Sequence, residues 1–159
     1  MTSDLRDLYQ DVILDHGKRP RNARVIEGAS IQQPAYNPLC GDRGTLYVEI
    51  GADGTTLKDV AYVGEGCSIS TASASIMTEF LRGKTRGEAL ATFDLFHDMV
   101  TAKPHEASHR VVPNLGKLSV FSGVAEFPAR VKCASLAWHA LRSALSQEPR
   151  ASTSPVSTE

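Results

Sequence analysis

Three cysteines and one aspartate are the residues of this chain best suited to bind a metal ion. Cys40 and Asp42 stand on either side of Gly41. Because glycine adopts backbone conformations that other residues disfavour, the thiol and the carboxylate can turn toward one point. Cys67 and Cys133 are the remaining cysteines, and three sulfurs with one carboxylate oxygen would complete a tetrahedral zinc site. The same ligands also suit iron.

The two later cysteines stand where helices are expected to begin. Cys67 follows a Gly-Glu-Gly segment, and Cys133 lies in the first turns of the last expected helix, near Arg130 and Lys132. A helix N-terminus and nearby cations both favour the thiolate, which is the form of cysteine that binds metal. A lone free cysteine is more often a small buried apolar residue, and the chain has no Cys-x-x-Cys pair. The placement of all three cysteines at glycine-framed turns or helix starts favours a metal site over three core residues.

The histidines offer competing ligands, which we reject. His139 shares its expected helix with Cys133, but a separation of six residues places it about 240° around the helix, facing away. The segment His105-Glu106-Ala107-Ser108-His109 matches the His-Glu-x-x-His pattern of zinc peptidases. Prolines on both sides restrict it to fewer than about three turns, so a stable helix with both imidazoles on one face is not expected. His16 is expected to interact with the C-terminus of the first helix.

Hydrophobic periodicity predicts one small domain with strands early in the chain and helices later. Apolar residues recur at helical spacing in residues 5–17, 67–81, 86–100, 115–121 and 129–145. Strands are predicted at 24–27, 45–50 and 57–63, the last two joined by a hairpin turn at 51–54. This order indicates an α+β fold, with the functional domain at 1–146. The Ser-, Thr- and Pro-rich tail at 147–159 is expected to be disordered.

Composition and charge exclude several classes of protein. The chain has 159 residues, 42% of them hydrophobic, and a net charge of −1, so neither nucleic acid nor an anionic membrane is expected as a partner. It has no apolar run near the roughly 20 residues that a membrane-spanning helix needs. The N-terminus does not resemble a signal peptide, and an odd number of cysteines argues against a disulfide framework. We therefore expect a cytoplasmic protein whose thiols serve chemistry or metal binding.

Three segments around the cysteines closely resemble the IscU/NifU N-terminal-domain family of iron–sulfur cluster assembly. They are Asn-Pro-Leu-Cys-Gly-Asp at 37–42, Gly-Glu-Gly-Cys-Ser-Ile-Ser at 64–70 and Arg-Val-Lys-Cys-Ala at 130–134. The resemblance extends over about residues 4–146. It implies a small antiparallel three-stranded sheet packed against about five to six helices, with the cysteines gathered at one end.

Within that family the sequence is more similar to the SufU-type members than to the IscU-type scaffolds. Lys132 stands where IscU-type proteins have a histidine before the third cysteine, and the stretch at about 103–126 resembles the SufU-type insertion. The resemblance implies a SufS-type cysteine desulfurase as partner, and zinc held by four ligands: Cys40, Asp42, Cys67 and Cys133.

The same resemblance implies a relay of sulfur. Cys40 would accept persulfide sulfur from the desulfurase while the other three ligands hold zinc, and the sulfur would pass to a downstream iron–sulfur assembly scaffold. Arg130 matches an arginine of SufU-type proteins that is implicated in their encounter with the desulfurase. Two alternatives stay open: a scaffold that assembles a labile [2Fe–2S] cluster on the same ligands, and a zinc site with a purely structural role.

Overall fold

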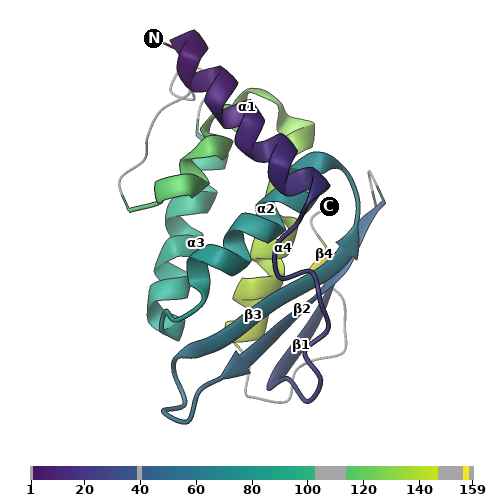
Figure 1. Ribbon diagram of the computed structural model, residues 1–159, viewed down its shortest axis with the longest axis vertical. Helices are drawn as coiled ribbons and strands as arrows, with labels where there is room; N and C mark the ends of the chain where they lie inside the picture. Colours follow the sequence, from purple (N-terminus) through teal and green to yellow (C-terminus); the bar gives the residue numbers. More distant parts are fainter. Residues whose placement is uncertain (1, 39–40, 103–113, 147–155, 158–159) are drawn as a thin grey trace.

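Helices cover one face of a small β-sheet in the computed structural model, which describes residues 2–38, 41–102, 114–146 and 156–157 (Figure 1). Strands β1 (Ile31–Asn37), β2 (Asp42–Ile50) and β3 (Leu57–Glu65) pair antiparallel in the order β3-β2-β1. The expected three-stranded antiparallel sheet is therefore confirmed. A two-residue strand from the tail, β4 (Val156–Ser157), adds a parallel neighbour to β1.

The first strand lies later in the chain than predicted. Residues 24–27 form no strand, and β1 begins at Ile31. Pro34 stands in the middle of β1, opposite Thr45. Proline cannot donate a ladder hydrogen bond and therefore argues against a strand in a sequence pattern. Here it is tolerated because β4 extends along only a small part of the outer side of β1, opposite Ala35 and Tyr36.

The described residues form five helices, one of which is a 3₁₀-helix. They are α1 (Thr2–Lys18), α2 (Ser68–Leu81), α3 (Arg86–Val100), the 3₁₀-helix η2 (Gly116–Glu126) and α4 (Pro128–Leu145). All five predicted helices are confirmed, although η2 is longer than expected and winds as 3₁₀. The His-Glu-x-x-His segment and residues 103–113 of the insertion lie outside the described residues. None of the described helices is long and apolar enough to cross a membrane.

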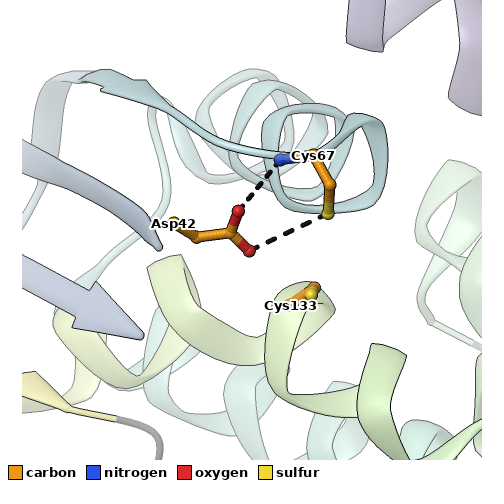
Figure 2. Close-up of side chains that lie close together, drawn as sticks. All are labelled: Asp42, Cys67 and Cys133. Atoms are coloured by element: carbon orange, nitrogen blue, oxygen red, sulfur yellow. Dashed lines mark hydrogen bonds between the residues drawn. The ribbon is translucent and has the colours of Figure 1, made fainter. Parts of the chain in front are cut away.

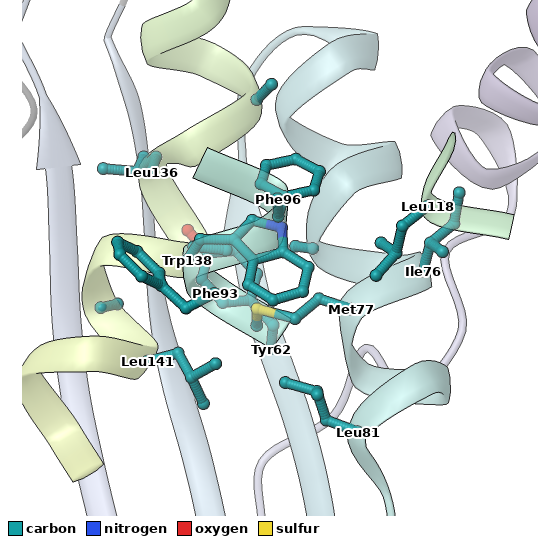
Figure 3. Packing of buried hydrophobic residues seen from close by; sticks show 14 of the residues in the cluster. Tyr62, Ile76, Met77, Leu81, Phe93, Phe96, Leu118, Leu136, Trp138 and Leu141 are labelled. Carbon is teal, nitrogen blue, oxygen red and sulfur yellow. The ribbon is translucent and has the colours of Figure 1, made fainter. Parts of the chain in front are cut away.

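A polar contact inside the core fixes α2 against α4. The Trp138 indole N–H of α4 donates to Ser73 Oγ of α2 at 3.1 Å, and the Ser73 hydroxyl donates to the Ala134 carbonyl at 2.5 Å. Trp138 also stacks on Phe96 of α3, with ring centroids 4.5 Å apart, at the centre of the apolar cluster drawn in Figure 3. Buried polar groups that are fully paired specify one packing arrangement. This contact therefore sets how the helix that begins after Cys67 lies on the helix that carries Cys133.

His16 joins α1 to α2 from a fully buried position. Its Nδ1 lies 2.7 Å from Ser75 Oγ, which also accepts the Arg21 backbone N–H at 2.8 Å. Its Nε2 has no hydrogen-bond partner among the described residues, and Glu79 Oε1 lies 3.8 Å away. The expected interaction of His16 with the helix C-terminus is thus replaced by a contact between helices. Burial lowers the pKa of His16, and the nearby charges of Lys117 and Arg21 lower it further.

We expect the protein to lose stability in mild acid through His16. The unfolded chain binds a proton at this residue near pH 6.5, whereas the folded protein binds it only at lower pH. Since the unfolded state then holds more protons, the free energy of unfolding falls as the pH drops below about 6.5, by at most about 1.4 kcal/mol per pH unit. Urea unfolding between pH 7.5 and 5.5 would show a smaller pH dependence for His16→Gln than for wild type. Equal slopes would contradict the prediction.

Candidate metal centre

Asp42, Cys67 and Cys133 come together from three different parts of the fold (Figure 2). Asp42 begins β2, Cys67 immediately precedes α2, and Cys133 lies in the second turn of α4. One ligand atom from each residue lies within 4.8 Å of the other two. Three of the four ligands expected from the sequence are therefore adjacent, and Cys40 lies outside the described residues.

Cys67 holds the Asp42 carboxylate through its backbone. Its N–H donates to Asp42 Oδ1 at 2.9 Å, and its Sγ lies 3.8 Å from Oδ2. Cys67 is also the N-cap of α2, where its Sγ accepts the Ser70 backbone N–H at 3.5 Å. The unpaired N–H groups of a helix start carry partial positive charge. The buried carboxylate and the sulfur are therefore both placed where negative charge is stabilised.

Glycines leave the room that this arrangement requires. A Cβ atom on Gly66 would collide with the Asp42 carboxylate, and Gly41 has a φ of +72°, which favours glycine. A Cβ on Gly44 would lie 2.5 Å from the Tyr62 hydroxyl. The role of Gly41 agrees with the sequence analysis, whereas Gly44 and Gly66 are missing from the sequence-based site, although the Gly-Glu-Gly segment before Cys67 was a signal for Gly66.

Tyr62 adds a polar group beneath the site. Its ring packs beside Gly44, two residues after Asp42 on the same strand. Burial raises the pKa of Tyr62, and the charge of Asp42 raises it further. The phenol therefore stays protonated and cannot add a second negative charge next to the carboxylate.

Arg130 supplies positive charge at the mouth of the site. Its guanidinium is exposed, and hydrogen bonding to Cys133 raises the pKa of Arg130, as do the charges of Cys67 and Cys133. Cys133 itself is buried on the first turns of α4. The cation expected from the sequence is thus next to two of the sulfurs.

The donor set and its dimensions fit a zinc ion. Tetrahedral zinc with bond lengths of about 2.1–2.3 Å places its sulfur and oxygen ligands about 3.6–3.8 Å apart. The Asp42–Cys67 separation of 3.8 Å already meets this value, and the widest separation of 4.8 Å needs only a small contraction. His139 takes no part, because its ring packs on Phe93 and His97, as its helical position predicted.

Comparisons of this sequence with a family model and with known proteins point to the same family. The model of the NifU-like N terminal domain matches residues 8–134. The zinc-dependent sulfurtransferase SufU of Bacillus subtilis is 42% identical over 92% of this chain and 95% of its own length. The iron–sulfur cluster assembly scaffold protein IscU of Streptococcus pyogenes is 41% identical over 94% of this chain and 89% of its own length.

A solved structure agrees with the sequence comparisons. The putative iron–sulfur cluster assembly scaffold protein of the SUF system from Fervidobacterium islandicum is 34% identical. It superposes with a TM-score of 0.75 over 85% of this chain and 94% of that one. The matches in sequence cover the segments of all three cysteines, and the match in structure covers the fold that gathers Asp42, Cys67 and Cys133. The chain therefore belongs to the NifU-like N-terminal domain family, whose similar members carry the names SufU and IscU.

Proposed function

We propose that this protein is a zinc-dependent sulfurtransferase that accepts persulfide sulfur from a SufS-type cysteine desulfurase for iron–sulfur cluster assembly. The observation that carries the proposal is the convergence of Asp42, Cys67 and Cys133 with the exposed Arg130 beside them. The name of the Bacillus subtilis relative supports this activity. We place the protein in the cytoplasm, where thiols stay reduced, with a downstream assembly scaffold as the recipient of the sulfur.

In this proposal Cys40, Asp42, Cys67 and Cys133 hold the metal. Zinc bound by them would keep the thiols deprotonated and, being redox-inert, would leave the oxidation state of sulfur unchanged. Two of the described ligands sit at or near helix starts, and Arg130 offsets part of their negative charge. The chain can therefore hold a thiolate-rich site in a form that is ready for nucleophilic attack.

The transfer itself is an exchange between two thiols. The donor persulfide, which arrives as an anion, takes up a proton from solvent on its terminal sulfur. The Cys40 thiolate attacks that sulfur, a new S–S bond forms to Cys40, and the donor S–S bond breaks. The electron pair of the broken bond stays on the donor cysteine, which leaves as a thiolate, so no oxidant is needed. Arg130, next to the sulfurs, is placed to stabilise the negative charge that moves between donor and acceptor.

A cluster-assembly scaffold is the second candidate. The same donor set could ligate a labile [2Fe–2S] centre, with iron in place of zinc. The Streptococcus pyogenes relative, named as a scaffold, is as similar to this chain as the sulfurtransferase is. Lys132 before Cys133 favours the sulfurtransferase, because it removes a potential imidazole ligand.

Metal content and desulfurase stimulation separate the two candidates. Aerobically purified wild type is expected to contain about one equivalent of zinc and to accelerate a SufS-type desulfurase. Cys40→Ala is expected to abolish the acceleration, whereas Ser146→Ala, an exposed substitution after α4, should not change it. A coloured protein with iron and sulfide that leaves the desulfurase unaffected would establish the scaffold instead.

A further inference from the structure

An open concavity lies beside the candidate metal centre. It has a volume of about 640 Å³ and is lined by Cys67, Ser68, Ile69, Phe127 and Arg130. Its lining therefore includes a cysteine of the candidate metal centre and an aromatic side chain. Phe127 is 60% exposed, the highest value for a large apolar residue in the described part of the chain. Exposed aromatic residues of this kind are characteristic of protein–protein interfaces.

The backbone holds Phe127 rigidly in this exposed position. Its N–H donates to the Val124 carbonyl at 2.8 Å, and its own carbonyl accepts the Arg130 N–H at 2.8 Å. Pro128 follows as the first residue of α4, which restricts Phe127 to an extended backbone. The exposure is thus fixed at a corner between η2 and α4. Because the backbone at Phe127 is already fixed, a partner that covers the ring does not have to order this part of the chain.

Arg130 gives the concavity a charge as well as an apolar rim. Its guanidinium is exposed and lies against Cys133 and Cys67. A ligand that suits both features has an anionic tip and an apolar collar. A cysteine persulfide on an exposed loop has this chemistry, because its terminal sulfur carries the charge and the flanking side chains can be apolar.

We propose that this concavity is the docking site for the persulfide-bearing loop of the sulfur donor, with Phe127 and Ile69 as the apolar contact and Arg130 beside the terminal sulfur. The inference rests on the proposed function and adds the surface that positions the donor. The location of the concavity favours a sulfur donor as its ligand, because Cys67 both lines the concavity and belongs to the candidate metal centre. A loop seated there brings its terminal sulfur next to Cys67, a residue of the candidate metal centre.

Titration of a persulfide-loaded SufS-type desulfurase with Phe127→Ala tests the proposal. The concentration for half-maximal stimulation is expected to rise about tenfold or more, in line with interface anchor residues. Maximal stimulation, zinc content and unfolding temperature should stay at wild-type values, and Phe127→Leu should recover part of the loss. Leu8→Ala is the matched control, because Leu8 on α1 is 57% exposed and does not line the concavity.

The outcomes of this titration distinguish failure of the docking site from failure of the proposed sulfurtransferase function. Wild type that neither binds nor stimulates the desulfurase overturns the proposed function and the docking site together. Wild type that stimulates, with Phe127→Ala titrating identically, overturns the docking site alone. A wild-type dimer in sedimentation that Phe127→Ala converts to a monomer would assign this face to self-association and also overturn the proposal.

Discussion

Gly66→Ala is expected to weaken zinc binding by about 10- to 100-fold, the range seen when groups that orient metal ligands are changed. The added Cβ would occupy the place of the Asp42 carboxylate, which must then leave its hydrogen bond to the Cys67 N–H. Competition with a chromogenic zinc chelator would measure the loss of affinity. The expected loss of affinity comes from displacement of the Asp42 carboxylate, because the alanine side chain itself can neither bind nor repel the metal.

Gly87→Ala is the control for this substitution. Gly87 lies in the first turn of α3, and a Cβ there would approach only Thr85 Oγ1, at 4.0 Å. Because alanine favours the helix by about 0.5–1 kcal/mol over glycine, this variant should be as stable as wild type or slightly more so. It should also bind zinc normally. Wild-type zinc affinity in Gly66→Ala would contradict the steric role assigned to that glycine.

Cys133→Ala is expected to remove the stabilisation that metal gives to the fold. The proposed ligands connect β2, α2 and α4, so a metal bound only by the folded state stabilises it by mass action. At a free metal concentration of 100 times the dissociation constant, this amounts to about 2.7 kcal/mol. For a chain of this size such a change shifts the unfolding temperature by on the order of 5–10 °C. Thermal unfolding with and without chelator would show this difference in wild type and its absence in Cys133→Ala.

Ser135→Ala provides the comparison two residues further along α4. Ser135 is buried, and its hydroxyl donates to the Val131 carbonyl within the same helix. The substitution alters the same helix without removing a proposed ligand. It should therefore keep the chelator-dependent shift in unfolding temperature. A shift that persists in Cys133→Ala would show that the buried sulfur is not a ligand.

Local patterns in the sequence predicted most elements but not the contacts between them. The capping box of Thr85 and Glu88 begins α3 where the pattern placed it, and the hairpin of β2 and β3 follows from alternation and turn residues. Strand β1 was missed because Pro34 interrupts its pattern. The burial of His16 was also missed, since it depends on Ser75, 59 residues away.

The candidate site was predictable in its residue types and not in its geometry. The ligand chemistry of Asp42, Cys67 and Cys133 is visible in the sequence, as is the cation at Arg130. Their distances depend on the packing of α2 against α4, which the Ser73–Trp138 contact fixes. The exposure of Phe127 has a similar origin. Its side chain is exposed at the corner between η2 and α4, just before Pro128.

The distribution of the ligands along the chain has a consequence for biosynthesis. Cys67 and Cys133 are separated by 66 residues, which a ribosome adding about 5–20 residues per second takes roughly 3–13 s to make. During that interval the nascent chain offers Asp42 and Cys67 but not the third described donor. The described set is complete only once α4 has been made and has packed through Trp138 onto α2. Under the proposed function, stable metal loading would therefore follow the synthesis of α4 and would report the packing of this helix onto α2.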